Sequence, residues 1–319
     1  MKLIIQIPCY NEEHTLPLTI EDLPVKIKGI DVIEYLVISD GSSDRTVEVA
    51  RELGVNHVVS LPENKGLAMA FMTGIESCLW LGADIIVNTD GDNQYSGLDI
   101  EKLVQPILDG KAEVVVGDRQ IDKIIHFSFL KKKLQKLGSW VVRLASRSNV
   151  IDTTSGFRAF SREAAMRLNV IFDYSYTLET IIEAGRRKAA IVNVPVRTNE
   201  KLRQSRLINS IWGYIRVSAS TIIRVYSMYR PLKVFLIISL FLFSGGFIIG
   251  ARYLYFFLIG QGAGNVQSLI LGSILITASL QLALFGLLAD AISAVRTIND
   301  ELLYRVKKLE YDKIEKPKS

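Results

Sequence analysis

The sequence has few of the residues on which several common protein classes depend. Its 319 residues include only two cysteines, Cys9 and Cys78, and three histidines. This argues against a disulfide-stabilised scaffold and against a His/Cys metal cluster. No G-x-G-x-x-G follows the first predicted strand and no G-x-x-x-x-G-K-[ST] occurs, which argues against a dinucleotide-binding domain and a P-loop NTPase. The apolar stretch near the N-terminus is too short for a signal peptide, so we expect residues 1–230 not to be exported.

Charge is missing from two long runs near the C-terminus. The runs 234–251 and 266–289 contain 18 and 24 residues without a single charged side chain. With their flanks, both are long enough to cross a bilayer as helices. The alternative is a pair of buried core helices, but such helices normally keep a polar stripe, and these runs have none. We therefore predict a two-helix membrane hairpin over residues 232–290, in a chain whose 49% hydrophobic content also excludes disorder.

Positive charge flanks this hairpin on both sides. Residues 201–233 contain seven basic residues and no acidic ones. The basic residues are Lys201, Arg203, Arg206, Arg216, Arg224, Arg230 and Lys233. More basic residues follow the second run, and the loop over 259–265 is uncharged. The positive-inside rule then places both termini on the cytoplasmic side of the cell's inner membrane. Residues 201–231 have apolar positions at helical spacing, which predicts a basic interfacial helix on anionic lipid before the spans, and residues 291–319 form a cytoplasmic tail.

Residues 1–200 have the pattern of an α/β domain. Apolar runs over 3–8, 35–40, 57–61, 84–90, 113–118 and 190–196 are predicted strands, and 44–53 and 66–81 are predicted helices. Alternation of this kind predicts a mostly parallel sheet with helices on both faces. Several strands end in polar clusters, which we expect to gather at one edge of the sheet, where such folds bind ligands.

The strongest cluster is the segment from Asp90 to Gln94, with the letters DGDNQ. Two carboxylates at a spacing of two, directly after an apolar strand, can both face one hard cation, and Gln94 adds an amide oxygen. Mg²⁺ or Mn²⁺ is typically bound by one or two carboxylates together with substrate phosphates. The alternative is a solvated turn, since Asp-Gly is a common turn dipeptide. The position after the predicted fourth strand favours the metal site.

Other polar residues follow the first three predicted strands. Tyr10 and Glu12 are candidates to stack on a base and to accept a hydrogen bond from a nucleoside, and Asp40 is a candidate ligand of a polar substrate group. Lys65 stands just before a predicted helix, where a lysine suits phosphate. Each of these residues also has a purely structural interpretation, such as helix capping by the loop that follows Asp40.

Together the segments IPCYNEE, VISDGSSDRT, NKGLAMA, NTDGDNQY, GDRQ and TTSGFRAFSRE resemble glycosyltransferase family 2, with its GT-A nucleotide-sugar fold. With the two following spans, the chain is similar to the polyisoprenyl-phosphate glycosyltransferases, which include relatives of dolichol-phosphate mannose synthase and GtrB-type glucosyltransferases. The resemblance implies an inverting, metal-dependent transfer of a sugar to a polyprenyl phosphate. UDP-glucose is the preferred donor and GDP-mannose the alternative, with UDP-galactose and an aminoarabinose donor also open.

The resemblance also implies roles for individual residues. The donor nucleotide would be held by Pro8, Tyr10, Asn11, Glu12, Asp40, Lys65 and the loop of Asp90, Gly91 and Asp92. The metal would be held by Asp90, Asp92 and Gln94, and Arg119 and Asp152 would join the two carboxylates as catalytic residues. The acceptor phosphate would meet Arg119, Lys133, Lys136, Ser139, Ser155, Arg158, Arg203, Ser205 and Arg206, with Gly156 beside them. The segment 201–206 lacks a glycine that the family often has there.

A phosphate acceptor is consistent with these residues. The oxygen of a phosphate monoester is anionic at neutral pH and needs no general base, and no histidine lies in the predicted polar loops. Arginines would offset the repulsion between two polyanions. Two alternatives stay open. One is a transferase to a hydroxyl acceptor such as diacylglycerol or a protein, with Asp152 as base, and the other is an inactive membrane scaffold. A homo-oligomer is also possible, with Gly245, Gly246 and Gly250 allowing close helix packing.

Overall fold

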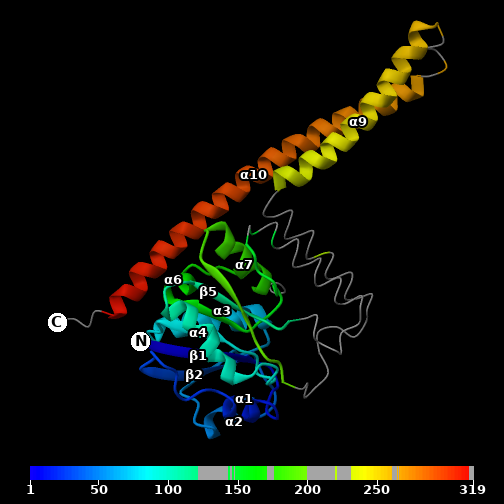
Figure 1. The fold of residues 1–319 in the computed structure, drawn as a ribbon. Coiled ribbons are helices and arrows are strands. Elements are labelled where there is room, and N and C mark those ends of the chain that lie inside the picture. Colours follow the sequence, from blue (N-terminus) through cyan, green and yellow to red (C-terminus); the bar gives the residue numbers. More distant parts are fainter. Residues whose placement is uncertain are drawn as a thin grey trace. The chain divides into compact units, whose positions relative to one another are not determined.

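The computed structural model describes residues 1–120, 143, 146, 148–170, 176–199, 220, 231–260, 264 and 266–315. For residues 312–315 it describes the backbone alone. Two compact units contain them (Figure 1). The first comprises residues 1–222 with 300–319, and the second comprises residues 223–299.

A seven-stranded sheet is the centre of the first unit, with the strand order β3-β2-β1-β4-β6-β5-β7. The strands are β1 (Lys2–Cys9), β2 (Val32–Ser39), β3 (His57–Ser60), β4 (Ile85–Asn88), β5 (Val114–Asp118), β6 (Arg158–Ser161) and β7 (Ile191–Pro195). All neighbours pair in parallel except at β6, which is antiparallel to both β4 and β5. The predicted α/β class and mostly parallel sheet are confirmed.

Helices cover both faces of this sheet. The helical elements are α1 (Leu16–Glu21), α2 (Thr46–Glu52), α3 (Leu67–Trp80), the 3-10 turn η1 (Gly97–Asp99), α4 (Ile100–Leu108), α6 (Arg162–Met166) and α7 (Tyr176–Arg186). Alternate side chains of β1, such as Ile5, pack with Leu103 of α4 in one buried core. Gln6 points to the other face and donates to the backbone of Phe71 in α3. The central strands are buried on both faces, which explains their near-continuous apolar sequences.

Strand β6 was not predicted from the sequence. It has only four residues, RAFS, and begins directly after the polar segment TTSGF. A run this short carries no usable periodicity. Its partners supply the stability instead, because Ala159 pairs with both Val87 and Val115 in the sheet interior. The reversed direction of β6 brings its first residue, Arg158, to the edge where β4 and β5 end.

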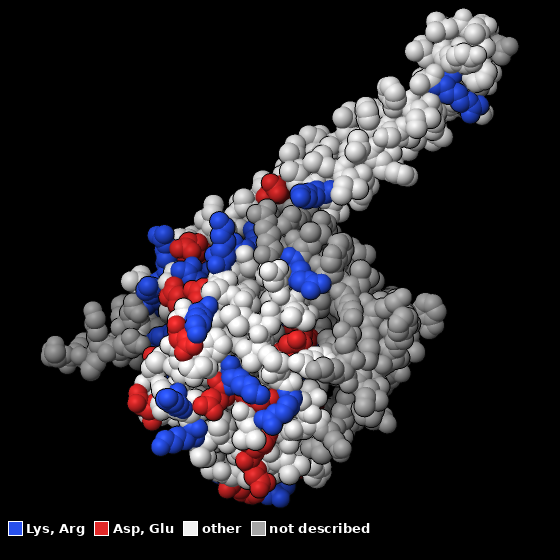
Figure 2. Space-filling model, in the orientation of Figure 1, with Lys and Arg blue, Asp and Glu red and all other residues white. Residues whose placement is uncertain are grey.

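The second unit is a helical hairpin. It contains α9 (Pro231–Leu258) and the first part of α10 (Val266–Glu315), and both helices are long and apolar enough to cross a membrane. They pack closely: Ser239 donates to the carbonyl of Ser279 at 2.8 Å, and a Cβ at Gly246 would meet the Gly272 carbonyl at 2.9 Å. Gly246 therefore serves contact within the chain. Most other side chains are exposed and apolar, and the hairpin is almost entirely white in Figure 2.

The last turns of α10 belong to the first unit and pack against α3 and α6. Tyr304 hydrogen-bonds to Glu163, and the guanidinium of Arg167 stacks on its ring at 3.6 Å. Lys307 donates to the carbonyl of Leu168 at 3.3 Å. The ring of Tyr311 lies edge-on to that of Trp80 at 5.3 Å. These contacts require the tail and the sheet unit to be on the same side of any membrane that the hairpin crosses.

Candidate functional site

Loops that follow β1, β2, β4 and β5 meet at one edge of the sheet, because these strands are parallel and in register. β5 reaches the same edge across the antiparallel β6. The loops contain the polar residues singled out in the sequence, as expected for the ligand-binding edge of such a fold.

The loop with Asp90 and Asp92 is held rigidly. The carbonyl of Gly91 accepts hydrogen bonds from Thr15 at 2.9 Å and Thr19 at 3.2 Å. A Cβ at Gly91 would lie 2.7 Å from the Sγ atom of Cys9. Asp92 accepts from the backbone N–H of Gln94 at 3.2 Å. The absent side chain at position 91 thus lets the loop settle onto the end of β1, which fixes the backbone of both carboxylate residues.

The ligands that this loop offers suit a divalent cation whose coordination a bound substrate would complete. Among the residues that the structure describes, no group of three His, Cys, Asp or Glu side chains is arranged to hold a metal. Two carboxylates and an amide remain, namely Asp90, Asp92 and Gln94. Mg²⁺ and Mn²⁺ accept one or two protein carboxylates when phosphate oxygens supply other ligands. Such a metal would therefore bind together with a phosphorylated substrate.

Two buried tyrosines lie close to Asp90. A Cβ at Gly156 would come within 3.0 Å of both Asp90 Oδ1 and the Tyr176 hydroxyl. Burial, and then the charge of Asp90, raise the pKa of Tyr176. Tyr95 stacks on Phe157 and accepts from the N–H of Gly156 at 3.3 Å, and burial raises its pKa to about 12. Both phenols therefore stay protonated at neutral pH.

A buried polar chain fixes the position of Gly156. Gln6 of β1 donates to the side chain of Asn88 at 2.9 Å, and Asn88 donates to the Gly156 carbonyl at 2.8 Å. Gln6 and Asn88 are both fully buried. Because unmade hydrogen bonds are costly in such a place, the two amides specify one arrangement of the loop that faces Asp90.

The expected nucleoside residues occupy the ends of β1 and β2. Tyr10 is exposed, and Asn11 has a left-handed backbone and accepts from the N–H of Ser43 at 2.8 Å. Glu12 is buried and accepts from the hydroxyl of Thr15 at 2.6 Å, a contact that stabilises the loop after β1. Pro8 lies within β1, opposite Ile38. Of this group, Tyr10 is the most exposed residue.

Asp40 and Lys65 form a second braced loop. The two oxygens of Asp40 accept from the backbone N–H groups of Lys65 at 2.8 Å and Gly66 at 3.0 Å. Asp40 is 3% exposed, whereas the side chain of Lys65 is exposed just before α3. The carboxylate thus orders the turn that presents Lys65, a position consistent with the predicted phosphate contact.

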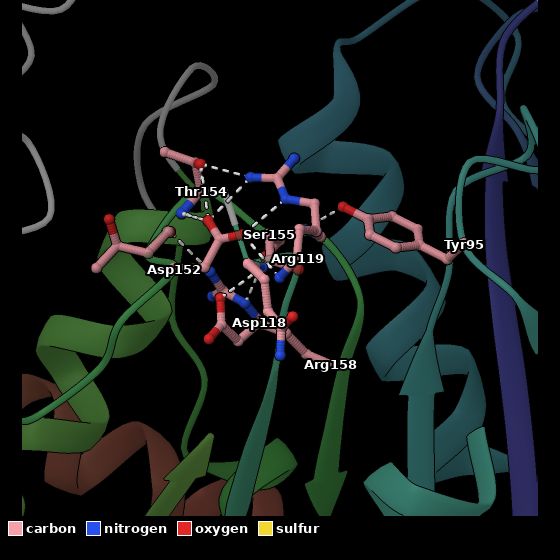
Figure 3. A network of polar contacts seen from close by, with 10 residues as sticks. Tyr95, Asp118, Arg119, Asp152, Thr154, Ser155 and Arg158 are labelled. Carbon is pink, nitrogen blue, oxygen red and sulfur yellow. Dashed lines mark hydrogen bonds and ion pairs between the residues drawn. The ribbon is translucent and has the colours of Figure 1, made fainter. Parts of the chain in front are cut away.

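Arg119 and Asp152 form a buried ion pair at the end of β5 (Figure 3). Nε and Nη2 of Arg119 donate to the two oxygens of Asp152 at 2.6 and 2.9 Å, and Nη2 also donates to Thr154 at 2.7 Å. Burial by itself would raise the pKa of Asp152, but the hydrogen bonds and charge of Arg119 lower it. Asp152 is therefore ionised, and both of its oxygens accept hydrogen bonds from the guanidinium of Arg119. Its contacts orient Arg119, whose Nη1 takes no part in these bonds, and a catalytic role for Asp152 stays a prediction.

Arg158 lies deeper than the sequence suggested. Its guanidinium donates to the carbonyls of Thr153, Ser155 and Thr177 and to the hydroxyl of Thr180, at 2.5–2.9 Å. The side chain is 1% exposed, and burial lowers its pKa to about 10. It remains a cation at neutral pH, but direct contact with an acceptor does not fit this position. Arg158 instead holds the segment 153–155 against α7. Ser155 is fully buried there as well.

The segment that follows β7 runs beside the carboxylate loop. Thr198 pairs with Tyr95, and Asn199 donates through its backbone to Gln94 at 2.9 Å and through its side chain to Asn93 at 3.1 Å. Just before it, Arg197 donates to the fully buried Asp99 through its backbone and guanidinium. Residues 197–199 therefore lie beside the carboxylate loop.

The remaining predicted acceptor residues lie outside the described residues, namely Lys133, Lys136, Ser139, Arg203, Ser205 and Arg206. Sequence reasoning missed Tyr95, Tyr176 and Asn199. Tyr95 directly follows the DGDNQ segment, and its place there is a usable signal. Tyr176 and Asn199 come close to that segment only through folding, and nothing local in the sequence marks them.

Comparison with known proteins gives consistent matches. The family model described as glycosyl transferase family 2 matches residues 4–168. An uncharacterized protein of Methanocaldococcus jannaschii is 33% identical over 67% of this chain and 88% of the relative. The UDP-N-acetylglucosamine–dolichyl-phosphate N-acetylglucosaminyltransferase of Methanococcus voltae is 32% identical over 60% and 83%. The undecaprenyl-phosphate mannosyltransferase of Micrococcus luteus is 28% identical over 67% and 90%.

A solved structure agrees in fold. Glucosyl-3-phosphoglycerate synthase of Mycobacterium tuberculosis, solved with Mn²⁺, UDP-glucose and phosphoglyceric acid, superposes with a TM-score of 0.56. The two sequences are 21% identical, and the match covers 71% of this chain and 78% of the other. The likeness shows that the two proteins share the GT-A fold.

Proposed function

Since the chain belongs to glycosyl transferase family 2 and is a glycosyltransferase, we propose that it transfers a hexose from a nucleotide diphosphate sugar to a polyprenyl phosphate at a membrane surface. The observation that carries the proposal is that the segment after β7 is hydrogen-bonded to the carboxylate loop. Asn199 donates to Gln94 and to Asn93. In the sequence, the basic stretch 201–233 follows Asn199. Relatives named as acting on dolichyl and undecaprenyl phosphate support the acceptor class.

The donor side follows from the chemistry of its residues. Asp90, Asp92 and Gln94 would hold Mg²⁺ or Mn²⁺, and the ion would neutralise charge on the diphosphate as it leaves. The exposed ring of Tyr10 would stack on the base, and the exposed Lys65 would contact a phosphate. Gly156 leaves the flank of Asp90 free of a side chain. Glucose from UDP-glucose is the donor we propose, with mannose from GDP-mannose as the alternative that the relative from Micrococcus luteus favours.

The acceptor side needs positive charge and no base. A phosphate monoester oxygen is already ionised near neutral pH, and a single displacement by it would invert the anomeric centre. Arg119, fixed by Asp152, offers Nη1 to an anion, and Arg203 and Arg206 would add charge from the segment after Asn199. Asp152 is a poor general base, because both its oxygens bind Arg119 and its pKa is lowered. A hydroxyl acceptor is therefore disfavoured.

Membrane attachment suits a lipid acceptor. Two helices can cross the membrane, and the tail contacts to α3 and α6 keep the C-terminal turns beside the catalytic unit. With the basic flanks, we place the catalytic unit and both termini on the cytoplasmic side. The polyprenyl tail would then stay in lipid while its phosphate reaches the edge of the sheet.

The full chain, purified in detergent, tests the proposal. It is incubated with undecaprenyl phosphate and Mn²⁺. UDP-glucose, GDP-mannose and UDP-N-acetylglucosamine are added as donors in separate reactions, and the lipid product is identified by mass spectrometry. We expect one hexosyl-phosphate lipid, lost in Asp92→Asn and kept in the matched control Asp109→Asn, which lies exposed at the end of α4. Transfer to diacylglycerol but not to the phosphate would refute the acceptor. Absence of product with every donor would favour an inactive scaffold.

A further inference from the structure

The end of α10 has two opposite faces, and the catalytic unit covers only one. Tyr304, Lys307 and Tyr311 are each less than a tenth exposed, and they form the face that packs on α3 and α6. Leu302, Val306 and Leu309 are each more than half exposed. In an α-helix, residues two apart are separated by about 200°, so the second set lies opposite the first.

The uncovered face has the spacing of a coiled coil. Its residues Ile292, Val295, Asn299, Leu302, Val306 and Leu309 follow one another at intervals of three, four, three, four and three. Those intervals place Ile292, Asn299 and Val306 at the a positions and Val295, Leu302 and Leu309 at the d positions of a heptad. All six are exposed within one continuous helix. A lone asparagine at an a position is typical of a helix pair with a fixed register. The stripe begins after Asp290, beyond the uncharged run that we assign to the bilayer.

We propose that this heptad stripe is the interface between two copies of the chain, paired in parallel through the ends of their α10 helices. Two copies inserted in the same membrane with the same topology present these helices in the same direction. In a parallel pair, each g residue meets the e residue of the following heptad in the partner helix. Arg305 at g would then meet Glu310 at e, and the symmetry of the pair provides this contact twice. The next contact toward the membrane joins Ile298 to Leu303, both apolar and exposed.

Self-association leaves the reaction edge uncovered. Ser161 pairs with Ile85 at the start of β4, so α6 begins at the edge of the sheet opposite the carboxylate loop. α3 also ends there, at Trp80. The tail packs on this opposite edge, and its heptad stripe faces away from the tail's own contacts. The pairing concerns assembly, and its test does not depend on which sugar or acceptor the enzyme uses.

Cysteine cross-linking in membranes containing the full chain tests the pairing. Leu302→Cys places a thiol at a d position, where the two copies face each other, and a short bis-maleimide should convert most of the protein to a covalent dimer. Lys308→Cys is the matched control, because it is exposed but rotated by about 120° from Leu302. The wild-type chain controls for the native thiols, both of which are buried.

Charge exchange identifies the partner as a second copy. In the Leu302→Cys background, Arg305→Glu or Glu310→Arg alone should lower the dimer yield several-fold, and the two together should restore it. An unchanged thermal midpoint shows that each variant is folded. A lipid surface or a different protein on the stripe would give no dimer at position 302, which would overturn the proposal. Equal yields at 302 and 308, or no recovery in the double exchange, would overturn it as well.

Discussion

Replacing Asp152 with asparagine should destabilise the catalytic unit by about 3 kcal/mol, the lower end of the cost of breaking a buried ion pair by removing one partner. The lower end applies because asparagine still offers one acceptor to the guanidinium. Arg119 is 9% exposed and Asp152 is fully buried, so solvent screens the pair little. The variant leaves Arg119 charged, buried and without its counterion. Transfer activity of the folded variant should fall as well, because Asp152 would no longer hold the guanidinium of Arg119 by two charged hydrogen bonds.

The destabilisation should depend on pH with a definite sign. Asp152 has a pKa below its ordinary value of 3.8 in the folded chain. Its contribution to stability is therefore complete above that value and is lost as the pH falls through the folded pKa. The gap in stability between wild type and Asp152→Asn should stay constant from pH 8 to pH 5 and narrow below about pH 4.

A double-mutant cycle with Arg119→Met provides the assay. Stability is followed by thermal unfolding of the full chain in detergent, and the same samples are assayed for transfer to a polyprenyl phosphate. Residues in direct contact are strongly coupled, so the double variant should lose much less stability than the sum of the single losses. Additive losses, or a loss below about 1 kcal/mol in Asp152→Asn alone, would refute the description of this pair as buried and mutually dependent.

Three further predictions follow from other contacts. Gly156→Ala should reduce transfer severely while the chain remains folded, since the new Cβ would lie 3.0 Å from the Asp90 carboxylate; full activity with Mn²⁺ would contradict the arrangement. Asp99→Asn should raise the apparent KM for the lipid phosphate more than that for the donor, because Arg197 would lose its ion pair and hold residues 197–199 less firmly beside the carboxylate loop; equal changes in both KM values would argue against this role. Gly262→Cys should react with an impermeant maleimide added to intact cells and Ser319→Cys should not; labelling of Ser319→Cys would show that the C-terminal tail lies outside the cell and would refute the proposed topology.

Much of the fold could be predicted because its signals are local. Buried parallel strands are recognisable as apolar runs, and Asp90 and Asp92 are separated by a single residue in the sequence. Arg158 shows where local reasoning ends. An arginine in a motif suggests contact with an anion, yet here carbonyls from Thr153 and Thr177, which come together only in the fold, surround it. The contact between Asp152 and Arg119 could not be predicted locally either, because the two residues lie 33 positions apart.

The packing of the tail on α3 and α6 has a consequence for how the protein is made. Residues 1–199 leave the ribosome first, and their sheet can form while the rest is still being synthesised. Tyr304, Lys307 and Tyr311 emerge only after both apolar helices. The face around Glu163 and Trp80 thus stays bare until the hairpin has inserted and synthesis is nearly complete. A truncated or wrongly inserted chain would keep that face exposed, which gives the cell's quality-control proteases a way to recognise it.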